Sequence, residues 1–287
     1  MSKNFIHTLN PKEIASVFNK NILKKAPNDT WLKWHANLES WVDQAIYKTI
    51  EKIGDHTHQK FLDIATGTGN NVILLSKMYP TCLFDACDIS KLYIEKAKNT
   101  ALKKNIDNIF FKISDAHHLL YKDKTYNVVT CFFSLMYFKN IDQTIQEFIR
   151  VSKPQGKIVI TTWGGDNLAF ITIMKLISID KNANYPDSQN PNLFSEKKEL
   201  LKLFNKYNFI DISIERYQIN IKWKGSSNEF WLFFKESNPS IEKILNSLEK
   251  IKRKKKEQEI IKELNKFENN GVLFLPTTIL ISILKKN

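Results

Sequence analysis

The stretch that decides the fold spans residues 61–71 and reads Phe61-Leu62-Asp63-Ile64-Ala65-Thr66-Gly67-Thr68-Gly69-Asn70-Asn71. Its first four residues are typical of a short buried strand. The two glycines open a tight loop, and an apolar helix pattern begins at Val72. This order of strand, glycine loop and helix lets backbone N–H groups approach a bound cofactor. Two glycines alone are a weak signal, so the segments that follow must decide the interpretation.

Strand and helix patterns alternate after this stretch. Strands are predicted over residues 60–65, 81–87, 109–113, 127–133 and 157–163, and helices over residues 70–79, 90–104 and 142–152. Two further strands are predicted at 208–214 and 277–284. Apolar strands that alternate with helices are typical of a parallel sheet covered on both faces. The sequence therefore predicts an α/β fold.

Helix patterns also flank and interrupt this alternation. They cover residues 10–22, 30–53, 168–179, 195–207, 228–236 and 239–269. No internal repeat or low-complexity linker separates the parts, so we expect one domain over residues 1–287. Its expected parts are an N-terminal helical cap (1–58), a cofactor-binding core (59–163), covering insertions (164–194 and 224–270) and a final strand segment (271–287).

Composition favours a globular protein of the cytoplasm. Hydrophobic residues make up 43% of the chain, and we find no apolar run of about 18 residues that would span a membrane. The first residues lack the apolar core of a signal peptide. Cys82, Cys87 and Cys131 lie in apolar runs, which is typical of reduced core thiols.

The net charge of +13 leaves two interpretations open. It could indicate an acidic partner such as nucleic acid, or it could reflect a bias toward lysine along the whole chain. The densest block, Lys250 to Lys256, is interleaved with Glu249, Glu257 and Glu259. That pattern favours a solvated helix face over a nucleic-acid contact.

Carboxylates follow two of the predicted strands. Asp88 ends the second strand, where a carboxylate can accept both hydroxyls of a ribose. Asp115 follows the third strand, where it can accept a hydrogen bond from an adenine amino group. Each residue alone would be explained as a helix cap. Their joint occurrence after the glycine loop indicates a nucleoside site at the carboxyl ends of the strands.

At these positions the chain resembles the class I S-adenosylmethionine-dependent methyltransferases, and within them the small-molecule branch of ubiquinone and menaquinone biosynthesis. The matching segments are residues 62–69, 85–90, 114–116, 126–130 and 150–157. The resemblance is strong over about 60–163 and weaker beyond. It implies a Rossmann-like sheet of seven mostly parallel strands with helices on both faces. The last strand would be antiparallel, inserted between strands five and six.

The resemblance also implies roles for individual residues. The methionine part of the cofactor would be held by Asp63, Ala65, Thr66, Gly67 and Gly69, while Asp88 would bind the ribose. Adenine would contact Ile89, Asp115 and Ala116, and Phe132 would lie beside the sulfonium. The implied cofactor is S-adenosylmethionine, with S-adenosylhomocysteine as product and no metal.

Several positions depart from the family pattern. Ala65 stands where many members have glycine, Asn127 replaces an aspartate, and Gln155 replaces a glycine. The segment 135–138 after strand four lacks the histidines that members often carry. The resemblance therefore assigns no catalytic residue.

The expected reaction is direct in-line displacement of a methyl group. A carbon or amine nucleophile needs mainly alignment, whereas a hydroxyl acceptor needs a general base. The candidate bases are Tyr137 and His35, with His117, His118 and Asp166 behind them.

Aromatic residues outside the core indicate the class of acceptor. Tryptophans and a tyrosine come from segments expected to cover the cleft, and we predict that they bind substrate: Trp31, Trp34, Trp163, Tyr185 and Trp231. Such a lining suits a small apolar or planar molecule, although ordinary core packing would also explain it. RNA or protein methylation on the basic surface, and cofactor binding without methyl transfer, stay open as alternatives.

Overall fold

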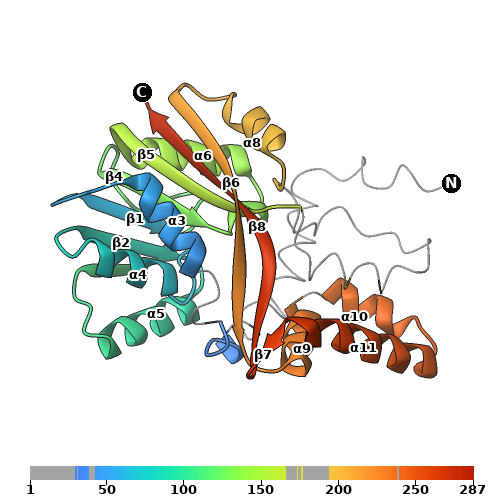
Figure 1. Cartoon of the computed structure of the whole chain (residues 1–287). Coiled ribbons are helices and arrows are strands. Elements are labelled where there is room, and N and C mark those ends of the chain that lie inside the picture. The colour runs from blue at the N-terminus through green and yellow to red at the C-terminus, as the bar shows by residue number, and fades with distance from the viewer. Residues whose placement is uncertain are drawn as a thin grey trace.

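The computed structural model describes residues 30, 32–38, 43–165, 173, 176, 194–237 and 239–287. Its centre is one eight-stranded sheet with the order β3-β2-β1-β4-β5-β8-β6, and β7 pairs with β8 (Figure 1). The strands are β1 (Lys60–Ile64), β2 (Leu83–Asp88), β3 (Ile109–Ile113), β4 (Tyr126–Phe132), β5 (Ser152–Trp163), β6 (Phe209–Lys224), β7 (Glu268–Asn269) and β8 (Val272–Lys286).

The first five strands of the chain pair in parallel. The last long strand, β8, pairs antiparallel with β5 on one side and with β6 on the other. The mostly parallel sheet and its inserted antiparallel strand are thus confirmed. The count is eight instead of the expected seven because the two-residue β7 adds a short hairpin at the start of β8.

Helices cover both faces of the sheet. One face packs on α6 (Ile141–Val151) and α8 (Lys197–Phe204), whose buried residues share a core with Leu62, Ile64 and Val129. The other face packs on α3 (Asp43–Ile53), α4 (Asn70–Met78) and α5 (Lys91–Lys103), with Phe61 and Val128 at its centre. Because adjacent strand residues point to opposite faces, Phe61 and Leu62 serve the two different cores.

Strands β6 and β8 run well beyond the rest of the sheet. They pair from Phe209↔Lys286 to Lys224↔Val272, whereas β8 meets β5 only up to Trp163↔Ile279. The free part is a two-stranded ribbon that leaves the body of the molecule (Figure 1). Predicted strands 208–214 and 277–284 were therefore too short. The period-two pattern of Ile219, Ile221 and Trp223 is the sequence signal for the extension.

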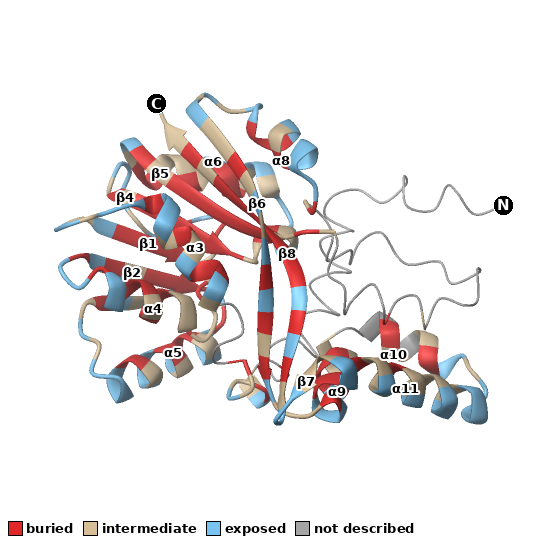
Figure 2. Cartoon of the chain, in the orientation of Figure 1, coloured by how far each residue is buried: buried red, intermediate tan, exposed pale blue. Residues whose placement is uncertain are grey.

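The ribbon carries a helical module, made of α9 (Ser227–Ser237), α10 (Pro239–Asn246) and α11 (Lys250–Leu264). The module has its own aromatic core, in which Trp223 is fully buried and stacks on Phe233 with ring centroids 5.1 Å apart. Burial is concentrated between α9, α10 and the ribbon end (Figure 2). The single helix predicted over 239–269 is instead split, because the chain turns between Asn246 and Lys250.

The N-terminal expectations are tested only in part. The predicted helix 10–22 lies outside the described residues, as does nearly all of 168–179. The predicted helix 30–53 is interrupted: residues 34–38 form turns and α3 begins at Asp43. Within the described part of the chain, no helix is both long and apolar enough to cross a membrane.

Candidate functional site

The glycine loop joins β1 to α4 through three residues with positive φ. Ala65, Gly67 and Gly69 have φ values of 56°, 56° and 84°. This left-handed region favours glycine, so Ala65 holds a conformation that costs roughly 1–2 kcal/mol in a residue with a Cβ. A Cβ on Gly67 would meet no atom within 4 Å, whereas one on Gly69 would lie 2.8 Å from the Ala97 Cβ. Gly69 thus permits close packing of α5, and Gly67 faces open space.

Asp63 lies at the carboxyl end of β1, beneath this loop. Its side chain is buried, and its Oδ1 accepts a 2.6 Å hydrogen bond from the Thr130 hydroxyl. Its Oδ2 is buried without a hydrogen-bond partner among the described residues, as is the Thr66 hydroxyl oxygen. Burial raises the pKa of Asp63 to about 6, against the opposing effects of the Thr130 hydrogen bond and of the nearby Thr66 hydroxyl. A buried carboxylate oxygen of this kind suits a bound cation.

Asp88 connects the loop to the next helix. Its Oδ2 accepts the Gly67 amide at 2.9 Å, and its Oδ1 accepts the Ser90 amide at 2.9 Å. Burial raises the pKa of the carboxyl, and these amides oppose the shift. Each carboxylate oxygen has a second lone pair, so two hydroxyl groups can still donate to Asp88. Asp88 therefore shapes the loop and keeps free acceptor capacity on both carboxylate oxygens.

Asp115 is held by its neighbour His117. Its Oδ1 accepts both the His117 amide at 2.9 Å and His117 Nδ1 at 2.7 Å. Burial alone would raise the pKa of Asp115, but these hydrogen bonds hold it below the usual value. The His117 Nε2 accepts the Asn140 amide at 3.2 Å at the start of α6. The ring therefore carries its proton on Nδ1 and bridges two loops, which explains His117 without a role as a general base.

The remaining predicted cofactor residues fall into two groups. Ile89 follows Asp88 and is 61% exposed, an apolar surface beside the carboxylate. Ala116 is buried next to Asp115. Phe132 is also buried, at the end of β4, and packs into the core with Val128 and Val159.

A stacked aromatic pair, Phe133 and Trp163, stands at the ends of β4 and β5 and was not predicted as a pair. The ring centroids are 4.0 Å apart at an interplanar angle of 26°. Phe133 has φ 54°, which is rare for a bulky residue, and its amide donates to the Thr161 carbonyl at 2.8 Å. Strained residues often occur at functional sites. The available signal was that an aromatic residue ends each of two successive predicted strands, 127–133 and 157–163.

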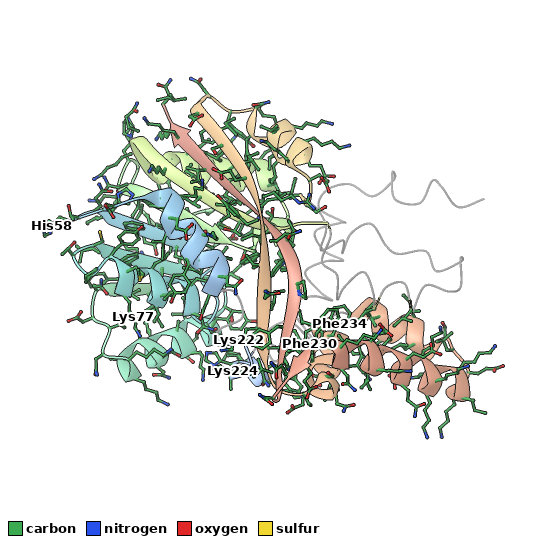
Figure 3. The ribbon with its side chains drawn as sticks, viewed as in Figure 1. His58, Lys77, Lys222, Lys224, Phe230 and Phe234 are labelled. Carbon is green, nitrogen blue, oxygen red and sulfur yellow. The ribbon has the colours of Figure 1, made fainter. Side chains whose placement is uncertain are left out.

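The other predicted substrate residues lie elsewhere. Trp34 and Trp231 are buried in the core of the helical module, and Trp34 Nε1 donates to Glu236 at 2.7 Å. Figure 3 shows this aromatic region around Phe230 and Phe234, close to Lys222 and Lys224 at the ribbon end. Trp31 and Tyr185 lie outside the described residues, as does the possible base Asp166.

The two candidate bases differ in setting. Tyr137 lies in the short turn η1 (Leu135–Tyr137) after β4 and is 66% exposed. His35 follows Trp34 in the turn that packs on the helical module, and it is half-buried. All three cysteines are buried, and burial raises the pKa of Cys87 and Cys131, which disfavours a nucleophilic thiolate at these two positions. The described residues contain no cluster of His, Cys, Asp or Glu that could hold a metal ion.

Comparison with known proteins places this geometry in a family. A model of a methyltransferase domain matches residues 55–209, more than half of the chain. The ubiquinone/menaquinone biosynthesis C-methyltransferase UbiE of Desulfotalea psychrophila is 27% identical over 61% of this chain and 76% of its own length. A demethylmenaquinone methyltransferase of Deinococcus radiodurans is 32% identical over 37% of this chain. That match spans only 43% of the relative.

Solved structures show the same fold. The YcgJ protein of Bacillus subtilis superposes with a TM-score of 0.55 at 17% identity, covering 85% of this chain and 99% of YcgJ. Phosphoethanolamine N-methyltransferase 2 of Haemonchus contortus, solved with S-adenosylmethionine, superposes with a TM-score of 0.52 at 16% identity. This superposition covers 85% of this chain and 53% of the Haemonchus chain.

Proposed function

Because this chain belongs to the methyltransferase domain family and is an S-adenosylmethionine-dependent methyltransferase, we propose that it methylates a small apolar acceptor. The observation that carries the proposal is the stacked pair of Phe133 and Trp163, which gives the carboxyl ends of β4 and β5 an apolar aromatic surface. Aromatic walls with few polar groups are typical of sites for small planar or apolar molecules. The quinone-biosynthesis relatives support the same class of acceptor.

We infer that the carboxylates hold the cofactor from one end to the other. The buried Oδ2 of Asp63 would accept the ammonium of the methionine part, and the Thr66 hydroxyl would supply a further polar contact. Asp88 would accept the ribose hydroxyls while keeping its bonds to the Gly67 and Ser90 amides. Asp115 would bind the adenine amino group, with Ile89 against the ring. The open side of Gly67 leaves room for the ligand.

The bound cofactor supplies an electrophilic methyl group on a sulfonium. The protein's part is to fix the acceptor in line with that group and to exclude water, which can lower the barrier by roughly 7–11 kcal/mol. Phe133 and Trp163 would position an apolar acceptor. An acceptor carbon or amine needs no further group, whereas a hydroxyl would require Tyr137 or His35 as base. Loss of turnover in Tyr137→Phe with cofactor affinity retained would identify Tyr137 as that base.

Calorimetric titration with S-adenosylmethionine tests the cofactor site first. We expect the wild-type chain to bind and Asp88→Ala to lose at least about tenfold in affinity, since it loses charge-assisted hydrogen bonds. Asp123→Ala is the control, because Asp123 is exposed and, among the described residues, forms an ion pair only with Arg150. Equal losses in the two variants would contradict the assignment. Production of S-adenosylhomocysteine with apolar phenols, quinols and amines then tests the acceptor class.

A further inference from the structure

Helix α11 presents a basic face on the side that turns away from the molecule. Its inner side is fixed by contacts: Ile260 and Leu264 are buried, and Arg253 pairs with Glu242 of α10. At about 100° per residue, the opposite side carries a set that we call the outer stripe. All of its members are exposed: Ile251, Lys254, Lys255, Gln258 and Lys262.

The lysines of the outer stripe differ from their neighbours in their pairing. On the flanks of the helix, Lys252 pairs with Glu249 and Lys256 with Glu259. Lys254, Lys255 and Lys262 form no ion pair with any described residue, and the stripe contains no acidic residue. The stripe therefore presents three lysines without an ion-pair partner among the described residues, along several turns of one helix face.

Ile251 adds an apolar contact to this charge. It is 85% exposed, the highest value among the large hydrophobic side chains in the described part of the chain. It lies in the first turn of α11, and α11 belongs to the helical module that projects away from the sheet (Figure 1). Moving an exposed isoleucine from water into an apolar layer lowers the free energy, and the lysines beside it can stay in an adjacent polar layer.

We propose that the outer stripe of α11 docks the protein on the surface of an anionic phospholipid bilayer. Each lysine near such a surface strengthens binding about fivefold, and Ile251 would enter the boundary between headgroups and acyl chains. RNA fits this surface less well. The stripe contains no aromatic side chain for base stacking, and the arginine of the helix faces inward. The inference rests on α11 alone and does not depend on the identity of the methyl acceptor.

Co-sedimentation with vesicles tests the proposal on the full chain. The vesicles are phosphatidylcholine alone or phosphatidylcholine mixed with phosphatidylglycerol. The test variants are Lys254→Gln/Lys255→Gln/Lys262→Gln and Ile251→Ser. The matched control removes the same charge from the body of the molecule, as Lys77→Gln/Lys98→Gln/Lys103→Gln on α4 and α5. Unchanged affinity for S-adenosylmethionine checks that every variant is folded.

We expect binding to the anionic vesicles only. The affinity for anionic vesicles should fall at least about tenfold in the stripe triple variant and a few fold in Ile251→Ser. It should fall much less in the control triple variant. Equal losses in the two triple variants would show a response to net charge and would overturn the proposal. So would binding of a single-stranded RNA tighter than that of the vesicles, full binding by Ile251→Ser, or no vesicle binding by the wild-type chain.

Discussion

The Thr130 hydroxyl donates a 2.6 Å hydrogen bond to Oδ1 of Asp63, while Oδ2 of the same carboxylate is buried without a partner among the described residues. Thr130 lies on β4 and Asp63 on β1, in the register Asp63↔Thr130. The sheet therefore orients the carboxylate, but only one of its two oxygens accepts a hydrogen bond from the described residues. A buried carboxylate in this state destabilises the ligand-free protein and is suited to a cation that arrives with a ligand.

Asp63→Asn should stabilise the ligand-free protein at neutral pH. Because burial raises the pKa of Asp63 from 3.8 to about 6, the folded state binds more protons than the unfolded state between these values. Stability contributed by this group thus falls as pH rises through that window. Asp63→Asn removes this loss of stability, so it should raise the free energy of unfolding by up to about 3 kcal/mol above pH 6.

Urea unfolding at about pH 4 and pH 8 measures the difference in stability between wild type and variant. The wild type and variant should differ at the higher pH and converge at the lower one. A constant difference would contradict the explanation.

Affinity for S-adenosylmethionine should depend on the protonation of Asp63 as well, but in the opposite direction: it should rise with pH, whereas stability falls. If Asp63 accepts the ammonium of the cofactor as proposed, its anionic form is the one that binds, so affinity should rise with pH and level off above about 6. Below that value it should fall by as much as about tenfold per pH unit. Calorimetric titrations across this range provide the curve. Asp63→Asn should bind weakly with a nearly flat profile, and a variant profile as steep as that of the wild type would exclude Asp63 as the titrating group.

The two glycines of the loop should respond differently to alanine. Both have positive φ, so Gly67→Ala and Gly69→Ala share a backbone cost of roughly 1–2 kcal/mol. Only at Gly69 would the new Cβ clash, 2.8 Å from the Ala97 Cβ. We therefore expect Gly69→Ala to lower the free energy of unfolding more, by about 1–3 kcal/mol beyond the shared cost. Gly67→Ala should keep most of its stability but bind cofactor poorly, since its Cβ enters the open side of the loop.

Thermal unfolding and cofactor titration of the two variants give the comparison. Equal destabilisation by both would show that backbone strain alone governs the loop. Ala65 offers an internal reference, because it already tolerates φ 56° with a Cβ.

The positions of the three carboxylates were predictable because these residues come at or just after the ends of strands. Asp63, Asp88 and Asp115 lie at or just beyond the carboxyl ends of β1, β2 and β3, which parallel pairing brings to one edge of the sheet. Their positions follow from local periodicity and from the rule that open α/β sheets bind ligands there. The double engagement of Asp88 by the Gly67 and Ser90 amides is a consequence of the same geometry.

Other features depend on contacts between distant segments. The turn after α10 depends on the aromatic core around Trp223, in which Trp34 packs with residues of β6, α9 and α10 that lie far along the chain. Periodicity identifies apolar faces but does not say which faces meet. The positive φ of Phe133 likewise has no local signal, because it is held by the Thr161 carbonyl and the Trp163 ring.

Phe133→Leu should separate acceptor binding from cofactor binding. The substitution keeps an apolar side chain on the same strained backbone but removes the ring that stacks on Trp163, with a loss of stability of about 1 kcal/mol. If the pair positions an apolar acceptor, KM for that acceptor should rise about tenfold while the affinity for S-adenosylmethionine stays unchanged. Phe110→Leu is the matched control, because Phe110 is 58% exposed on the edge strand β3. It should alter neither quantity. A fall in cofactor affinity with an unchanged acceptor KM would instead assign the Phe133 ring to the cofactor side of the site.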